Sequence, residues 1–384
     1  MTHRERIRRI LHYQPVDRMP VVQFGYWGET LRKWAKEGHI TQATARDWRD
    51  GNAVDMTLDA KLGFDLNWYT TFRPAVGLRP GFESKIVEEL PDGTQKRLSG
   101  DGVVYLQRPG AGSIPAHVDH LLKDRKAWEE LYLPKFQWHK DRVQKAGVQT
   151  DDGIKPFDKG GLDFLKSGRR DFHYGLHCGS LYGSVRNILT MEGSCYMLAD
   201  DEALFDEIID TIAGLCYRAT SEVLEAGAIF DFGHFWEDIC FKNGPLIAPD
   251  VFRRKVGPHY RRICDLLGRH GLDIVSLDCD GCIDALVPIW IENGVNTMFP
   301  IEVGTWNGNI KPWREKYGRA ALGVGGMNKN VFALGRKEVD AEIERLRPLV
   351  ELGGFIPCPD HRIPPTARWD SVRYYCERMR AVFG

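Results

Sequence analysis

The sequence of 384 residues contains no apolar run that approaches the ~20 residues needed to span a membrane. It also has no excess of one charge, because 52 Lys and Arg residues balance 53 Asp and Glu residues. This balance gives no reason to expect nucleic acid or an anionic membrane as a partner. The first residues, "MTHRERIRRIL", lack an apolar signal core and a small-residue cleavage site, so we expect a cytoplasmic protein.

A disulfide framework and internal repeats are also missing. The nine cysteines are an odd number and are scattered from Cys178 to Cys376, unlike the paired cysteines of a small secreted domain. Reduced thiols are the default in the cytosol. We find no repeat of fixed period in the sequence. A hydrophobic content of 43% is enough for a large buried core.

What does recur is an alternation of short β-branched or aromatic runs with amphipathic stretches. Segments such as 201–224 and 337–352 have helical periodicity, and several end at Gly or Asn. Strands that alternate with helices pair in parallel, and eight such units predict an α/β fold of the (β/α)₈ TIM-barrel type. The eight predicted strands are 19–25, 64–70, 172–178, 228–235, 272–278, 295–301, 320–326 and 353–358.

One region interrupts this alternation. Residues 83–108 alternate with period two around the turn sequences "PDG" and "SGDG", which predicts an antiparallel β-hairpin excursion. Residues 109–170 are rich in Pro, Gly and charge, with one predicted helix at 124–131. We therefore expect a single barrel domain over 1–384, with an insertion at about 83–170 that elaborates the barrel's upper face.

Catalytic residues of such barrels lie at the carboxyl ends of the strands. The fifth predicted strand runs into "VSLDCDGCIDALV", which holds Asp278, Asp280 and the thiols of Cys279 and Cys282. Period-two spacing puts both carboxylates on one face and turns Cys279 away, which argues against a redox or zinc CxxC pair. A polar turn is the structural alternative, but the carboxylates are the stronger candidates for function.

Carboxylates also follow the neighbouring strands. Converging carboxylates either raise one another's pKa values or are neutralised by a cation. They therefore suit acid–base catalysis or a metal site that Asp, Glu and His complete. A single strand-end acid is more often structural, but acids and histidines at several strand ends favour function for the group. The predicted catalytic residues are Glu237, Asp280 and Glu302.

Aromatic and basic residues near the predicted strand ends suggest a substrate pocket. Core packing explains some of the aromatic residues, and the others suit a flat or apolar ligand. The stretch "GVGGMNK" lacks the Lys-Ser/Thr ending of a phosphate loop, so we do not expect a nucleotide there. The predicted substrate-binding residues are Tyr26, Trp27, Trp68, His177, His234, Trp236 and Lys329.

The order of these motifs resembles the uroporphyrinogen decarboxylase superfamily, which also contains zinc-dependent, corrinoid-linked methyltransferases. The resemblance covers most of the chain outside 80–170. It implies a distorted (β/α)₈ barrel with its site at the C-terminal mouth, often in a homodimer. The matching stretches are "RERIRRILHYQPVDRMPVV", "EAGAIFDFGHFWEDICFKNGPLIAPDVFRRKVGPHYRRI", "HGLDIVSLDCDGCIDALVPIWIENGVNTMFPIEV", "REKYGRAALGVGGMN" and "ELGGFIPCPDHRIPP".

Two departures from the family pattern separate its branches. The decarboxylases have an Arg-rich stretch after the first strand, whereas this chain reads "FGYWGETLRKW" with no Arg before Arg32. The methyltransferases bind zinc through a His-x-Cys pair and a later Cys. The resemblance places Asp278, Asp280 and His361 at or near these positions, and each can bind zinc or another divalent metal. Oxygen-rich ligation suits harder partners than a coenzyme thiol.

The resemblance implies methyl transfer from a small O- or N-linked methyl donor to a corrinoid protein, with a carboxylate/His site that a metal could occupy. One alternative is a decarboxylase for uroporphyrinogen III or another acid, with Asp278 or Asp280 as the proton donor. Another is a catalytically inactive barrel that acts as a binding protein, since fold alone does not imply function. CO₂ production would distinguish the first alternative.

Overall fold

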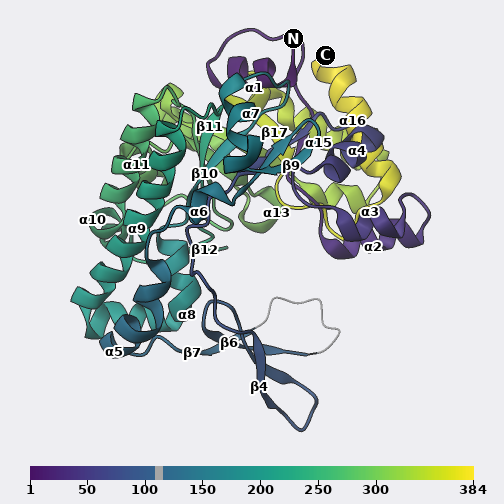
Figure 1. Cartoon of the computed structure of the whole chain (residues 1–384). Helices are drawn as coiled ribbons and strands as arrows, with labels where there is room; N and C mark the ends of the chain where they lie inside the picture. Colours follow the sequence, from purple (N-terminus) through teal and green to yellow (C-terminus); the bar gives the residue numbers. More distant parts are fainter. Residues whose placement is uncertain (109–115) are drawn as a thin grey trace.

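The computed structural model describes residues 1–108 and 116–384 (Figure 1). Its centre is a seven-stranded parallel sheet in the order β17-β16-β15-β14-β11-β10-β3. A shorter parallel pair, β1 and β2, and a parallel bridge between Tyr26 and Ile363 continue this sheet towards β17. The fold is therefore the predicted α/β barrel; seven of the eight predicted strands are confirmed, and the second is broken into two short strands.

The barrel strands are short and almost wholly buried, as expected where helices cover a parallel sheet. Every residue of β14 and β15 is buried, for example. The barrel strands are β1 (Val22–Gln23), β2 (Leu66–Asn67), β3 (Thr71–Phe72), β10 (Gly175–Gly179), β11 (Phe232–Trp236), β14 (Val275–Asp278), β15 (Thr297–Ile301), β16 (Leu322–Met327) and β17 (Phe355–Pro359).

Helices connect successive strands, and the predicted helices 201–224 and 337–352 correspond to α9 and α15. The Asp201 side chain accepts the Leu204 N–H at 2.9 Å and so fixes the start of α9. The helices of the barrel are α1 (His3–Leu11), α2 (Gly28–Lys36), α3 (Gln42–Asp47), α4 (Ala53–Leu62), α8 (Tyr182–Asp200), α9 (Glu202–Glu225), α10 (Pro249–Lys255), α11 (Gly257–Arg269), α12 (Val287–Glu292), α13 (Val303–Trp306), α14 (Ile310–Tyr317), α15 (Arg336–Val350) and α16 (Trp369–Phe383). No helix in the described ranges is long and apolar enough to cross a membrane.

The second barrel strand departs from the prediction, because it is broken into β2 and β3 rather than continuous over 64–70. The Asn67 side chain stabilises the break by accepting the Tyr69 N–H at 2.8 Å, while its carbonyl accepts the Thr70 N–H at 3.2 Å. The residues of this segment have high β-propensity, so a prediction from propensity does not detect the turn that the Asn67 side chain stabilises. As a consequence, Tyr69 and Arg73 stand at the mouth of the barrel beside the end of β14.

The inserted region contains the predicted antiparallel strands. They form a four-stranded sheet that extends away from the barrel, at the opposite end of the molecule from both termini (Figure 1). Residues 109–115 of the predicted insertion lie outside the described residues. The inserted elements are β4 (Lys85–Glu89), β5 (Gln95–Leu98), β6 (Val103–Gln107), β7 (Ala116–His120), α5 (Arg125–Ala127), α6 (Asp141–Gln144), β8 (Gly147–Thr150), β9 (Gly153–Pro156) and α7 (Leu162–Ser167).

A buried arginine ties the inserted region to the segment after β3. Arg142 has no exposed surface, and its guanidinium donates to four backbone carbonyls. The acceptors at Ala75 and Gly77 belong to the segment that leaves the barrel, and those at Lys135 and Gln137 belong to the insertion. One side chain therefore holds two chain segments together by charge-assisted hydrogen bonds.

We predict that Arg142→Met lowers the free energy of unfolding by about 3 kcal/mol, because several buried carbonyls lose their donor. Urea denaturation measures the change. The matched control is Lys140→Met, which removes an exposed cation from the same segment. Equal stability of the two variants would contradict the anchoring role of Arg142.

Candidate functional site

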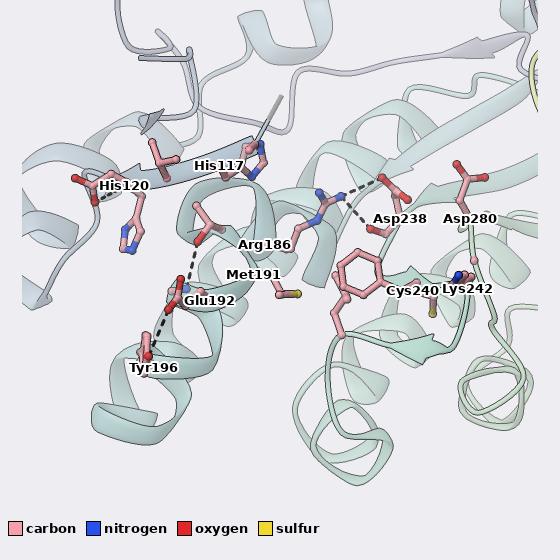
Figure 2. Close-up of a pocket in the computed structure, with 18 of the residues that line it drawn as sticks. His117, His120, Arg186, Met191, Glu192, Tyr196, Asp238, Cys240, Lys242 and Asp280 are labelled. Atoms are coloured by element: carbon pink, nitrogen blue, oxygen red, sulfur yellow. Dashed lines mark hydrogen bonds and ion pairs between the residues drawn. The ribbon is translucent and has the colours of Figure 1, made fainter. Parts of the chain in front are cut away.

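A pocket of about 860 Å³ lies between the barrel mouth and the inserted sheet. Figure 2 shows His117 and His120 of β7 at one end, Asp238 and Asp280 at the other, and Arg186 of α8 between them. The remaining polar or aromatic lining residues include Asp119, Lys123, Glu192, Tyr196, Phe241, Lys242, Glu302, Thr305 and His361. The pocket therefore joins the strand-end loops of the barrel to the insertion.

Asp280 and His361 form a pair at the inner end of the pocket. His361 Nε2 lies 3.2 Å from Asp280 Oδ2, and its ring stacks on the exposed Trp27 with 5.5 Å between ring centres. The other carboxylate oxygen, Asp280 Oδ1, is buried and has no hydrogen-bond partner among the described residues. Asp280 Oδ1 is thus an unused hydrogen-bond acceptor that a ligand in the pocket could occupy.

Two further carboxyl groups stand beside Asp280. Glu302 accepts the Gly281 N–H at 2.6 Å and the Thr305 hydroxyl at 2.8 Å, and burial together with the charge of Asp280 raises its pKa. Burial and Asp280 likewise raise the pKa of Asp238. These carboxyls hold protons more tightly than free ones do, which suits general acid catalysis.

Asp278 lies deeper than Asp280, with 6% of its surface exposed. The Tyr69 hydroxyl donates to its Oδ2 at 2.5 Å. Burial, reinforced by the charge of Asp280, raises the pKa of Asp278 well above the usual range for a carboxyl. Strand β14 ends at Asp278, so the period-two rule does not extend to Asp280 and the two carboxylates have different partners.

The predicted metal ligands do not form a three-ligand site as they are arranged. Asp280 and His361 contact each other, but Asp278 is engaged by Tyr69. Within 1–108 and 116–384, no group of three or more His, Cys, Asp or Glu side chains is placed to hold a metal ion. Asp280 and His361 are instead positioned to exchange a proton.

Glu237 is fully buried and does not reach the pocket. It accepts the Leu181 and Gly183 N–H groups at 2.7 and 2.6 Å and the Tyr260 hydroxyl at 2.5 Å. These bonds fix the start of α8, which carries Arg186 to the pocket. Burial raises the pKa of Glu237 to about 7. Glu237, which the sequence predicts to be catalytic, therefore lies where it positions α8 and Arg186 and does not face the pocket.

The predicted substrate-binding residues occupy different environments. Trp27 stacks on His361, and Trp236 lies 5.9 Å from the Arg186 guanidinium. None of the seven lines the pocket: Tyr26 bonds Asp59 in the core, Trp68 bonds Ser276 inside the barrel, and Lys329 forms an ion pair with Asp360. His177 and His234 are register partners inside the barrel.

The sequence analysis missed three residues at the mouth, namely Tyr69, Arg73 and Arg186. Arg186 donates to the carbonyl and carboxylate of Asp238 at 2.9 and 3.2 Å. It lies within a helix, so the strand-end rule could not find it. Arg73 directly follows β3, and the same rule finds it once the second strand is extended to Phe72.

No protein-family model and no curated protein sequence matches this chain. Among solved structures, a methyltransferase from Methanosarcina mazei is similar with a TM-score of 0.61 and 15% identity, over 99% of this chain and 98% of that chain. A B12-independent methionine synthase from a Shewanella species has a TM-score of 0.48 and 10% identity, over 95% of this chain and 98% of that one. At such low identity, the likeness to the Methanosarcina protein establishes a shared fold.

The raised pKa of Glu237 predicts a specific pH dependence of stability. Between its ordinary pKa of 4.5 and its folded pKa of about 7, the folded state binds more protons than the unfolded state. Stability is therefore fully present below 4.5 and falls as the pH rises through about 7. We predict that the free energy of unfolding, relative to that of Glu237→Gln, falls by about 3 kcal/mol across this window. The exposed Glu315→Gln serves as the control, and parallel pH profiles for wild type and Glu237→Gln would contradict the assignment.

Proposed function

We propose that the chain is an enzyme that transfers a methyl group from a small O- or N-linked donor to an acceptor, with Asp280 and His361 as the acid–base pair. The observation that carries this proposal is the unpartnered Asp280 Oδ1 beside His361 and two carboxyls with raised pKa values. The shared fold with the Methanosarcina methyltransferase supports the choice of reaction only as an analogy.

The charge of the pocket favours a cationic methyl donor. Five acidic residues line it, Asp119, Glu192, Asp238, Asp280 and Glu302, against the three basic residues Lys123, Arg186 and Lys242. A ligand that brings a positive charge relieves the repulsion between these carboxylates. Exposed aromatic rings such as Phe241 add a surface for a methylated ammonium group. A methylated amine therefore fits better than a neutral ether.

In the proposed reaction the bond between the methyl carbon and the donor heteroatom breaks. The methyl group moves to the acceptor without the bonding electrons, which stay on the heteroatom. A leaving oxygen then takes a proton from the Asp280–His361 pair, and Glu302 resupplies it. A leaving amine from a quaternary donor departs neutral and needs no proton, so the carboxylates act there by stabilising the cation before transfer.

A corrinoid carried by a partner protein would supply the nucleophilic centre that accepts the methyl group. The pocket of about 860 Å³ exceeds the space that a small donor fills, which supports a second reactant at its outer end. Residues Asp119 and Glu192 lie at that outer end. The homodimer, the cytoplasmic location and zinc remain predictions from the sequence, and we derive no step through a metal because the donors do not converge.

Decarboxylation is the second candidate, and one observation favours it. The sequence has no Arg before Arg32 where the decarboxylases have an Arg-rich stretch after the first strand. Arg73 nevertheless places a cation at the mouth, beside Tyr69 and Asp278. Burial raises the pKa of Asp278 and so favours its protonated form, which a proton donor to a carbanion requires. Detection of CO₂ would favour this reaction over methyl transfer.

We predict that Asp280→Asn and His361→Gln each lower methyl transfer from methoxy donors roughly 100- to 10,000-fold, the range typical of general acid–base groups, because the leaving oxygen needs a proton. The assay uses methylamine and methoxy donors with free cob(I)alamin as the acceptor. Asp92→Asn, an exposed carboxylate on the inserted sheet, is the matched control and should leave the rate unchanged. A wild-type protein that is inert towards every donor, or variants as active as wild type, would count against the proposal.

A further inference from the structure

Arg73 differs from the basic side chains that are paired at the barrel mouth. Arg186, Arg362 and Lys329 each form an ion pair, with Asp238, Asp50 and Asp360 respectively. Arg73 is exposed and has no ion pair within the described part of the chain. Its guanidinium carbon lies 4.6 Å from the centre of the Tyr69 ring. Arg73, like Lys242 of the pocket, is therefore a cation that no carboxylate of the described residues neutralises, and of these two it is the one that packs on Tyr69.

Two histidines lie on the two strands next to β3, which Arg73 directly follows. Strand β3 pairs with β10 so that Phe72 is opposite Leu176, and Arg73 and His177 directly follow these partners along the two chains. His177 is in turn paired with His234 of β11. Residues at the same level of neighbouring parallel strands project from the same face of the sheet. The two histidines thus belong to one side of the sheet, and the charge of Arg73 acts on both of them.

The histidines have unused hydrogen-bonding capacity. His234 is fully buried, and neither of its ring nitrogens has a partner among the described residues. His177 is only partly buried, and its Nδ1 also lacks a partner. Buried polar groups in native proteins are nearly always hydrogen-bonded, so an unpaired pair of imidazoles beside a free guanidinium points to a missing polar group.

We infer that Arg73 and His177, with His234 behind them, form a subsite for a single carboxylate group of the substrate. The inference rests on the proposed function and deepens it, because it names the donor as a methylated amine that also carries a carboxylate. Guanidinium groups bind carboxylates through two parallel hydrogen bonds, which fixes orientation as well as charge.

The charge of the subsite selects a monoanion. Burial, followed by the charge of Arg73, lowers the pKa of both His177 and His234 well below the ordinary value. Both imidazoles are therefore neutral at pH 7 and offer hydrogen bonds without adding charge. The single positive charge of Arg73 matches one carboxylate better than it matches a doubly charged phosphate.

The subsite is connected by direct contacts to Asp278, which is close in sequence to the acid–base pair. Arg73 packs on Tyr69, whose hydroxyl bonds Asp278, and Asp278 is two residues from Asp280. The mouth therefore presents a cation on the β3 side and carboxylates on the β14 side. A zwitterionic donor would place its carboxylate at Arg73 and its methylated ammonium group at Asp280.

Isothermal titration calorimetry with two matched probes tests the subsite without requiring turnover. The probes are trimethylglycine and choline, which share a trimethylammonium group and differ in a carboxylate against a hydroxyl. The variants are Arg73→Gln, Arg73→Lys and the control Arg8→Gln, which removes an exposed cation from α1. Because Arg73 is exposed, its variants should fold, and circular dichroism checks this.

We expect wild type and Arg8→Gln to bind trimethylglycine roughly 10- to 100-fold more tightly than choline, as a charge-assisted pair provides. Arg73→Gln should abolish this preference and leave choline binding unchanged. Arg73→Lys should keep part of it, because Lys retains the charge without the planar fork. The pKa of His177, followed by NMR, should rise when trimethylglycine binds, because the carboxylate offsets the charge of Arg73.

Equal binding of the two probes by wild type, no binding of trimethylglycine, or a preference that survives Arg73→Gln would each overturn the inference. The outcome is separable from that of the proposed function. A carboxylate preference that depends on Arg73, in a protein without methyl-transfer activity, would keep the subsite and reject the reaction. Methyl transfer from choline and trimethylglycine at equal efficiency would keep the reaction and reject the subsite.

Discussion

In addition to burial, the negative charge of Asp280 raises the pKa values of three other carboxyl groups at the barrel mouth, those of Asp238, Asp278 and Glu302. Closure of a parallel barrel brings the carboxyl ends of its strands to one place, so this crowding follows from the fold. Within the described residues, the direct cationic partner of the group is Arg186, which pairs with Asp238. The remaining repulsion is relieved by retained protons or by a cationic ligand, and both outcomes are chemically useful.

Such a cluster needs a rigid frame, and two buried carboxylates provide it by accepting backbone N–H groups. Glu237 holds the start of α8, and Asp360 accepts the Val303, Gly304 and Lys329 N–H groups. Each joins the end of one barrel strand to the loop after another. Acids at strand ends therefore divide into those that face the pocket and those that fix its walls, and the division depends on tertiary contacts.

This division marks the limit of what the sequence could predict. Strand–helix alternation and strand-end polarity were enough to predict the barrel and to select Asp280, Glu302 and His361, which the structure brings to one pocket. The same rule could not separate Glu237 from them, because its backbone partners at 181 and 183 are distant in sequence. Arg73 was missed because Asn67 breaks the second strand with a local turn that strand periodicity does not detect.

The resemblance noted in the sequence places Asp278, Asp280 and His361 at or near zinc-ligand positions, and their partners in the structure bear on whether they could hold a metal. Zinc ligands must be deprotonated and must converge on one point. Here Asp278 accepts a hydrogen bond from the Tyr69 hydroxyl and has a raised pKa, while Asp280 and His361 form a hydrogen bond with each other. Each of the three side chains thus forms a hydrogen bond with a neighbouring group, and the three do not converge on one point. This arrangement suits Brønsted acid catalysis combined with the binding of a ligand of complementary charge.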